Sequence, residues 1–345
     1  MKRLVVLLFF LVASGVLMAL IITSPASDSV QFSWYTGESI RCELEVYNDD
    51  FSTQATESNP SKFHVHNIGE LKPDSNYHYL IRCNSSDEIM IEGSFSIPLN
   101  PGDEFEFAVY GDSRSNLSVH EKVVKTIAKK EPLFVIHTGD IVYSDNRLND
   151  WEDFFKATEP FGSTLFLPVI GNHEKEARNY KAFFALPGNE SYYSYRAGDL
   201  LFLMLNTNER FDRYSKQYKW LKSLLKSETA KFTIAVFHHP AFSYGSHGDS
   251  FFVKTILVPL FEKYGVDLVL TGHDHNYQRI EHNGITYIVT GGGGASLYGI
   301  KDLSGPTASF KGHHFVLFEY DSGYLKGICY DTNENVIDSF DLFPR

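Results

Sequence analysis

The first part of the chain alternates apolar and polar residues with the two-residue period of a β-strand. Residues 30–34 and 42–46 both show this alternation. Residues 71–79 add a similar stretch, which includes a turn-forming Lys-Pro-Asp. Short period-2 segments separated by turn residues are typical of a β-sandwich. The pattern therefore predicts an all-β domain over residues 27–100, which a turn-rich Asn-Pro-Gly-Asp stretch at residues 100–103 separates from the rest of the chain.

The pattern changes after residue 104, where continuous apolar runs begin to alternate with helical periodicity. Apolar residues at helical spacing predict helices near residues 119–130 and 220–225. Buried strands are predicted at residues 105–110, 133–136, 165–170, 200–205, 232–237, 266–270 and 285–289. Continuous apolar strands between helices indicate an α/β domain whose sheets are covered on both faces, and we expect it to occupy residues 104–345.

The N-terminus has the features of a targeting segment. Lys2 and Arg3 precede an apolar run over residues 4–22, and Ser24-Pro25-Ala26 has the small-x-small pattern of a cleavage site. The run is long for a signal peptide and just long enough to span a bilayer as an anchor. Residues 1–26 are therefore predicted to be a signal peptide or a membrane anchor. In both cases the rest of the chain is extracytoplasmic, either secreted or attached to the membrane through residues 4–22.

The charge balance restricts the class of ligand. A formal net charge of -12 disfavours binding to nucleic acids and gives no overall attraction to anionic substrates, so any such attraction must come from local cations. The three cysteines permit one intramolecular disulfide at most. Cys42 and Cys83 both fall in the first domain, where either a disulfide or two buried thiols fits the sequence.

Polar clusters come directly after five of the predicted strands. Each cluster alone has an ordinary explanation as a turn, a helix cap or a structural histidine. Carboxyl ends of strands in α/β sheets are where ligands bind, however, so five clusters in succession indicate one shared site. Their oxygen and imidazole donors suit Fe, Zn or Mn, and two such metals can clamp a phosphoryl group during its transfer. The clusters are residues 111–114, 139–143, 171–174, 238–240 and 272–275.

At these residues the chain resembles the calcineurin-like metallophosphoesterases and, more narrowly, the purple acid phosphatases. The resemblance rests on three ordered motifs, Gly-Asp-x-x-Tyr from residue 139, Gly-Asn-His-Glu from 171 and Gly-His-x-His-x-Tyr-x-Arg from 272. It implies two β-sheets flanked by helices. The stretch from Leu71 to Tyr79 similarly resembles the tyrosine corner of fibronectin type III domains, which implies such a sandwich before the catalytic domain.

The resemblance also implies the metal ligands. Metal one would be ferric iron held by Asp112, Asp140, Tyr143 and His275. Metal two would be Fe, Zn or Mn held by Asp140, Asn172, His238 and His273.

The same resemblance suggests three catalytic groups around the metals. His173 would face the substrate phosphate, and His247 lies in a Gly-rich loop where the plant enzymes carry a general acid. Arg114 departs from the usual purple acid phosphatase motif, which has glycine there. Its guanidinium would contact substrate phosphate or form a salt bridge.

The expected function is hydrolysis of small phosphate monoesters by a metal-bound hydroxide, in the manner of an acid phosphatase. A phosphodiesterase or nucleotidase on the same scaffold is the alternative, and a non-enzymatic surface protein is a third. The sequence leaves the oligomeric state and the physiological substrate open.

Overall fold

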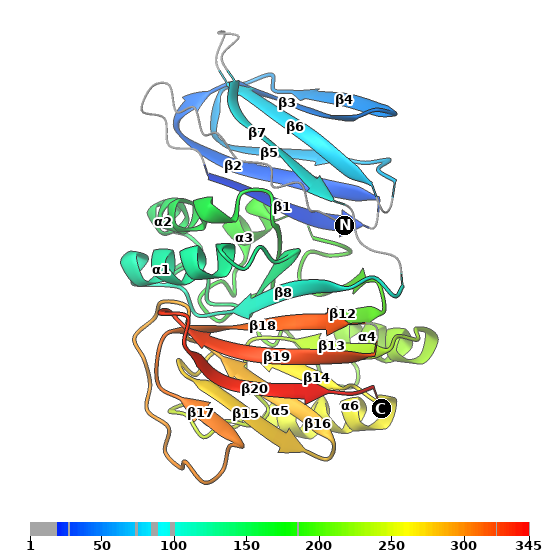
Figure 1. Ribbon diagram of the computed structural model, residues 1–345, viewed down its shortest axis with the longest axis vertical. Coiled ribbons are helices and arrows are strands. Elements are labelled where there is room, and N and C mark those ends of the chain that lie inside the picture. The colour runs from blue at the N-terminus through cyan, green and yellow to red at the C-terminus, as the bar shows by residue number, and fades with distance from the viewer. Residues whose placement is uncertain are drawn as a thin grey trace.

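The computed structural model describes residues 19–26, 28–72, 75–83, 89–96, 101–184, 186–321 and 323–344, which form three β-sheets and the helices around them (Figure 1). A nine-stranded sheet has the order β20-β19-β18-β8-β9-β10-β1-β2-β5. A seven-stranded sheet has the order β11-β12-β13-β14-β16-β15-β17, and a four-stranded sheet has the order β4-β3-β6-β7.

The N-terminal part is all-β, as the alternating pattern predicts. Its strands are β1 (Ala19–Ala26), β2 (Ser29–Ile40), β3 (Cys42–Asn48), β4 (Phe51–Thr56), β5 (Ser61–Ile68), β6 (Asn76–Cys83) and β7 (Ile89–Ser96). The strands β1, β2 and β5 face the four-stranded sheet across an aromatic core. Phe32 of β2 packs edge-on against Tyr79 and Phe95, with ring centroids 5.2 and 5.5 Å away. Opposed apolar faces of this kind hold a sandwich together.

A disulfide joins Cys42 to Cys83 within the four-stranded sheet. The two residues are direct cross-strand partners on β3 and β6. Of the two possibilities that the sequence leaves open, the structure contains the bonded pair. Cys329 is a buried free cysteine of the described residues.

Strand β1 includes the last eight residues of the predicted targeting segment, residues 19–26. Leu20, Ile21 and Ile22 are buried, β1 pairs with β2 over most of its length, and Ile22 pairs with Leu165 of β10. The last part of the apolar run is therefore core of the folded protein, because the nine-stranded sheet runs from one predicted domain into the other. Residues 1–18 lie outside the described residues. Among the helices that are described, none has the length and apolar character needed to cross a membrane.

The C-terminal part contains two stacked sheets. The first sheet receives β8 (Phe105–Tyr110), β9 (Phe134–His137), β10 (Leu165–Pro168), β18 (His314–Asp321), β19 (Tyr324–Asp331) and β20 (Val336–Leu342). The second contains β11 (Tyr193–Ala197), β12 (Leu200–Met204), β13 (Phe232–Val236), β14 (Leu268–Thr271), β15 (Tyr277–His282), β16 (Ile285–Thr290) and β17 (Ala308–Phe310). Phe202 of β12 packs edge-on against Phe107 and Phe134 and so joins the two sheets.

Helices accompany both of these sheets. They are α1 (Leu117–Ala128), α2 (Leu148–Thr158), α3 (Arg178–Phe183), α4 (Lys216–Ser227), α5 (Phe251–Ile256) and α6 (Val258–Tyr264), with a 3-10 turn over Glu159–Phe161. Alternate residues of β12 show the double burial, because Phe202 faces the other sheet whereas Leu203 packs in a core with Leu221 of α4 and Phe261 of α6. Both faces of the second sheet are therefore apolar, which is why its strands appear as continuous apolar runs in the sequence.

Candidate metal centre

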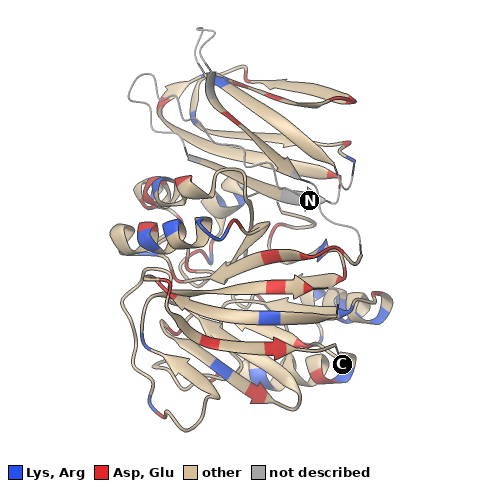
Figure 2. Cartoon of the chain, in the orientation of Figure 1, with Lys and Arg blue, Asp and Glu red and all other residues tan. Residues whose placement is uncertain are grey.

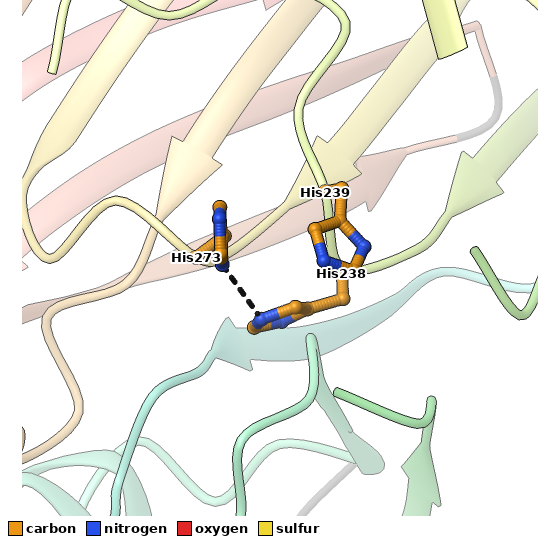
Figure 3. Close-up of side chains that lie close together, drawn as sticks. All are labelled: His238, His239 and His273. Atoms are coloured by element: carbon orange, nitrogen blue, oxygen red, sulfur yellow. Dashed lines mark hydrogen bonds between the residues drawn. The ribbon is translucent and has the colours of Figure 1, made fainter. Parts of the chain in front are cut away.

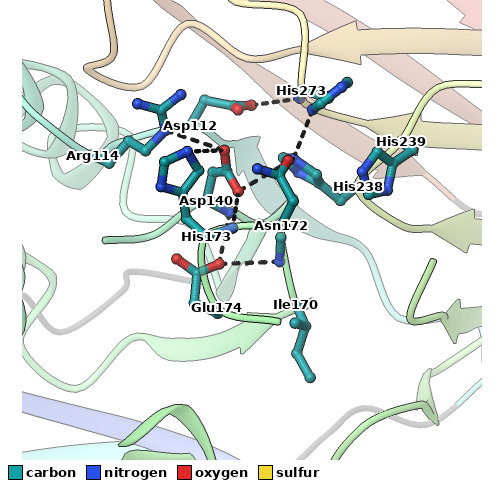
Figure 4. Close-up of polar contacts among 12 residues, drawn as sticks. Asp112, Arg114, Asp140, Ile170, Asn172, His173, Glu174, His238, His239 and His273 are labelled. Carbon is teal, nitrogen blue, oxygen red and sulfur yellow. Dashed lines mark hydrogen bonds and ion pairs between the residues drawn. The ribbon is translucent and has the colours of Figure 1, made fainter. Parts of the chain in front are cut away.

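The polar clusters meet at one edge of the two stacked sheets (Figure 4). Strands β8, β9 and β10 are parallel neighbours in one sheet, and β12, β13 and β14 are parallel neighbours in the other. Their carboxyl ends therefore open on the same side. A hydrogen bond joins the loops of the two sheets, because the Nδ1 of His238, after β13, lies 2.9 Å from the carbonyl oxygen of Thr138, after β9. The loops after these strands carry Asp112, Asp140, Asn172, His238, His273 and His275.

Three residues of the centre have left-handed backbone conformations. The φ angles are 57° at Asp112, 56° at Asp140 and 72° at His273. Such conformations cost non-glycine residues about 1–3 kcal/mol and persist where the surroundings enforce them. Glycine is needed beside them, because a Cβ on Gly171 would collide with the backbone nitrogen and carboxylate of Asp140. The loops thus maintain strained turns that aim these side chains at one point.

The first donor cluster consists of Asp112, Asp140 and His275, whose ligand atoms all lie within 4.8 Å of one another. The Nδ1 of His275 lies 2.6 Å from the carbonyl oxygen of Ser296, which can only accept, so Nδ1 carries a proton and Nε2 faces Asp112 Oδ1 at 3.4 Å. Asp112 is fully buried. Its Oδ2 accepts the N–H of His273, but its Oδ1 has no hydrogen-bond partner within 3.5 Å with suitable geometry among the described residues. A buried carboxylate oxygen beside an imidazole nitrogen fits a cation.

The second donor cluster consists of His238, His239 and His273 (Figure 3). Because His238 donates through Nδ1, its Nε2 is an acceptor. That nitrogen lies 3.0 Å from Asn172 Oδ1, 3.3 Å from Asp140 Oδ1 and 3.2 Å from His273 Nδ1. Several acceptors directed at one another are also what a bound cation would satisfy.

The protonation states of His273 and Asp140 agree with a site that binds cations. Burial lowers the pKa of His273 to about 2, so its imidazole is neutral and able to coordinate. Burial raises the pKa of Asp140, but neighbouring basic groups, Arg114 among them, outweigh it and lower the pKa to about 2. Asp140 is therefore a carboxylate, and it contacts both donor clusters. The donors are carboxylate, amide and imidazole groups, which suit Fe, Zn or Mn.

The four remaining predicted site residues surround this centre at different distances. Arg114 forms the salt bridge that was one of its two expected roles, with Nε 3.2 Å from Asp140 Oδ2. His173 donates from Nδ1 to the carbonyl oxygen of Tyr143 at 2.5 Å, and its Nε2 lies 3.8 Å from Asp140 Oδ2. The exposed His247 has its ring centroid 4.1 Å from that of His273. Both histidines therefore border the donor clusters.

Tyr143 occupies a more open position than the buried donors do. Its side chain is 52% exposed, and its ring centroid lies 5.3 Å from that of His173 and 6.0 Å from the guanidinium carbons of Arg114 and Arg147. The described contacts of Tyr143 are thus made by its ring and its carbonyl. Its role as an iron ligand stays a prediction.

Sequence reasoning did not assign roles to several buried residues that position the centre. Glu174 is fully buried and accepts the N–H groups of Asp140, Val142 and Gly171 at 3.0 to 3.1 Å. His239, which stood beside a predicted ligand, joins the second donor cluster. The only signal was that Glu174 lies inside a motif and His239 inside a polar cluster, because backbone hydrogen bonds leave no pattern of their own.

Two further buried residues hold the loop that carries His247. Asp274 accepts the hydroxyl of Ser243 at 2.5 Å and the N–H of His247 at 2.9 Å. Gln278 accepts the N–H of Tyr244 at 2.7 Å. These contacts fix the loop over His273.

The calcineurin-like phosphoesterase family model matches residues 105–277, which is half of the chain. The chain belongs to the calcineurin-like phosphoesterase family. This confirms the superfamily predicted from the three motifs, and residues 105–277 include every residue of both donor clusters.

Similar proteins and solved structures show which members of this family the chain resembles. The chain is 30% identical to purple acid phosphatase 21 of Arabidopsis thaliana over 266 residues, covering 68% of this chain and 59% of that protein. It is 26% identical to the probable inactive purple acid phosphatase 1 of the same plant, covering 77% and 53%. The chain thus spans a little over half the length of these relatives. The structure of a purple acid phosphatase from yellow lupin seeds superposes with a TM-score of 0.78 at 20% identity, over 93% of this chain and 73% of that one, which shows a shared fold.

Proposed function

We propose that this chain is a dinuclear-metal phosphatase of the purple acid phosphatase type that hydrolyses small phosphate monoesters. The observation that carries the proposal is the position of Asp140. Its carboxylate belongs to the first donor cluster and also lies 3.3 Å from His238 of the second, as a bridging ligand requires. The relatives named purple acid phosphatases support the same conclusion.

The residues that would hold the metals are those of the motifs. Asp112, Asp140, Tyr143 and His275 would hold ferric iron, and Asp140, Asn172, His238 and His273 would hold Fe, Zn or Mn. A metal pair of this kind supplies Lewis acidity and activates water at neutral or acidic pH. The chain itself supplies orientation, since backbone contacts to Thr138 and Ser296 fix the rings of His238 and His275.

Three residues are placed to act on the substrate. His173 keeps its Nε2 towards the centre because Nδ1 donates to the carbonyl oxygen of Tyr143. This lets it contact a phosphate oxygen or protonate the leaving group. His247, next to His273, is a second candidate for the acid. Arg114 reaches Asp140 and can extend a second guanidinium edge to a phosphate oxygen.

The direct test measures the hydrolysis of two substrates by protein whose metal content has been determined. We expect about two equivalents of metal per chain and faster hydrolysis of p-nitrophenyl phosphate than of bis-p-nitrophenyl phosphate. Preference for the diester would replace the monoesterase with a phosphodiesterase. Stable metal binding with no hydrolysis of either would favour a non-enzymatic protein, a result that one relative's name, probable inactive purple acid phosphatase 1, makes worth checking.

The N-terminal part is best explained as a fibronectin type III-like domain on an exported protein. Three strands in the order β1-β2-β5 face four in the order β4-β3-β6-β7, and the Tyr77 hydroxyl accepts the N–H of Lys72 at 2.8 Å as a tyrosine corner would. The Cys42–Cys83 disulfide supports an extracytoplasmic location, because such bonds persist in oxidising compartments. The part of the apolar run before β1, residues 4–18, would provide export, and membrane attachment if it is retained. Mass spectrometry of the protein released from cells would identify its N-terminus and so test this location.

A further inference from the structure

A cavity of about 410 Å³ opens beside the donor clusters and is not used by the chemistry above. It lies between the start of α1, the loop after β9 and helix α2. We call it the side cavity. Its wall includes Arg114, Leu117, Tyr143, Arg147 and Phe154. Its volume lies within the range of small-molecule sites.

Arg114 connects the side cavity to the metal centre. Its Nε contacts Asp140 Oδ2, and its Nη1 lies 3.4 Å from the hydroxyl of Ser115. These contacts use the Nε–H and one N–H of Nη1. Nη2 carries two further N–H donors that can serve a ligand in the cavity. Arg114 would then contact such a ligand and the Asp140 carboxylate together.

Arg147 places a second guanidinium on the wall of the same cavity. Arg114 and Arg147 both lie 6.0 Å from the ring centroid of Tyr143. The side chain of Arg147 is 61% exposed and pairs with Asp150 at 3.4 Å, so a ligand can reach it. Both guanidinium groups thus border the same cavity, and a guanidinium can bind phosphate oxygens in a bidentate way.

The cavity wall also includes Asp150 and Asp153, so its two guanidinium groups are accompanied by two carboxylates. Asp150 pairs with Arg147 and accepts the N–H of Ser144, and Asp153 lies 3.8 Å from the amine of Lys156. Acidic and basic residues are otherwise interspersed along the chain (Figure 2), whose net charge is -12. Arg114 and Arg147 are the cationic residues of the cavity wall, and a phosphate bound there would share their N–H donors with the carboxylates.

We propose that the side cavity binds the second phosphate of a substrate that carries two phosphate groups, while the first phosphate occupies the metal centre. The apolar wall formed by Leu117 and Phe154 would cover the carbon chain between them. The proposal rests on the proposed phosphatase function and specifies its substrate class as bisphosphates.

The first test measures selectivity in the metal-loaded, full-length protein. The ratio of kcat/KM for fructose 1,6-bisphosphate to kcat/KM for fructose 6-phosphate is compared in wild type and Arg147→Gln. We expect the ratio to fall about tenfold in the variant, as the loss of a charge-assisted hydrogen bond implies. A matched control, Arg196→Gln, removes an arginine of β11 that pairs with Glu228 at 3.0 Å, and it should leave the ratio unchanged. An unchanged ratio in Arg147→Gln would overturn the proposal.

The second test does not require turnover. Calorimetry compares alkyl bisphosphonates, from propane to hexane chains, with propylphosphonate, because their carbon–phosphorus bonds resist hydrolysis. At least one bisphosphonate should bind wild type about tenfold more tightly than the monophosphonate, and Arg147→Gln should remove the difference. Equal binding of all compounds would overturn the proposal. A bisphosphonate preference in a protein that hydrolyses no phosphate ester would support the cavity and refute the phosphatase function.

Discussion

Glu174 holds Asp140 in place through the backbone, because its Oε2 accepts the Asp140 N–H at 3.0 Å while its Oε1 accepts the N–H of Val142. Burial, and then the nearby Asp140, raise the pKa of Glu174 well above its usual value, which shows how unfavourable the location is for a charge. The three N–H donors reduce that cost without removing it. The left-handed backbone at Asp140 is therefore maintained by a residue that does not face the donor clusters.

Replacing Glu174 with Gln should weaken metal binding without removing a ligand. An amide NH₂ would then face a backbone N–H, and a buried donor without an acceptor costs about 1–3 kcal/mol. Loss of a supporting partner of this kind typically lowers metal affinity by about 10–100-fold. Metal titration and thermal unfolding measure the two effects. Glu176→Gln, a change in a more exposed residue of the same loop that accepts from Asn146 at 3.0 Å, serves as the control. Metal affinity equal to wild type in Glu174→Gln would show that the loop keeps its shape alone.

Asp140→Asn should abolish most activity and lower the metal content. The substitution removes the charge that contacts both donor clusters, so we expect a loss of about 100-fold or more in kcat/KM, beyond the range of supporting residues. Elemental analysis alongside the rate separates loss of metal from loss of chemistry. Asp212→Asn changes an exposed ion pair with Arg210 and should affect neither quantity. Full activity of Asp140→Asn with both metals retained is incompatible with a bridging role.

Tyr143→Phe tests the identity of the first metal. If the phenolate binds ferric iron, the wild type has a visible charge-transfer band that the variant lacks. Tyr214→Phe is a suitable control because this tyrosine is 82% exposed. An oxidised, iron-containing wild type without a visible band would remove Tyr143 from the ligand set, and its half-exposed ring would then belong only to the side cavity.

Part of this arrangement could be predicted from the sequence, and the reason is physical. Apolar runs at residues 105–110 and 232–237 have few alternatives to buried strands, and the structure has β8 and β13 there. Polar donors such as Asp112 and His238 directly after such strands must share one edge of the fold. The direction of the Tyr143 side chain depends instead on a rotamer, which no pattern of residue types encodes.

The pairing of β1 with β10 shows a different limit of prediction from the sequence. Ile22 and Leu165 are far apart in the sequence, and an apolar run suits a core strand as well as a targeting segment. Local periodicity cannot decide between these uses, because the decision depends on a distant partner strand. The boundary at residue 26 therefore stays a prediction, although residues 19–26 form β1.

Acid should destabilise the protein through His120, a buried histidine of α1 outside the donor clusters. Burial lowers the pKa of His120 to about 3, and its Nε2 lies 3.1 Å from the hydroxyl of Tyr110. The unfolded chain binds the proton with a pKa near 6.5, so the unfolded state binds more protons between about pH 6.5 and 3. The stability is therefore fully present above about pH 6.5 and declines as the pH falls.

The decline can be assigned to His120 by comparing wild type with His120→Gln. Relative to the variant, the free energy of unfolding of wild type should fall by about 1.4 kcal/mol per pH unit below pH 6. Urea unfolding at pH 7.5, 6.0 and 5.0 measures this difference. Parallel pH curves for the two proteins would show that His120 does not carry the effect.

Truncation should distinguish the targeting part of the N-terminus from the part that belongs to the fold. Removing residues 1–18 keeps β1 and should leave a soluble protein with unchanged core. Removing residues 1–26 deletes the buried Leu20, Ile21 and Ile22, each of which contributes about 1.5–3 kcal/mol on burial. That loss approaches the whole stability of a typical domain, about 5–15 kcal/mol, so the longer truncation should be insoluble or unfold at a much lower temperature. In the protein that lacks only residues 1–18, Ile22→Asp should reproduce the effect because Ile22 is fully buried opposite Leu165, whereas Asp28→Ala, at an exposed turn, should not. Equal unfolding temperatures for the two truncations would contradict the place of β1 in the nine-stranded sheet.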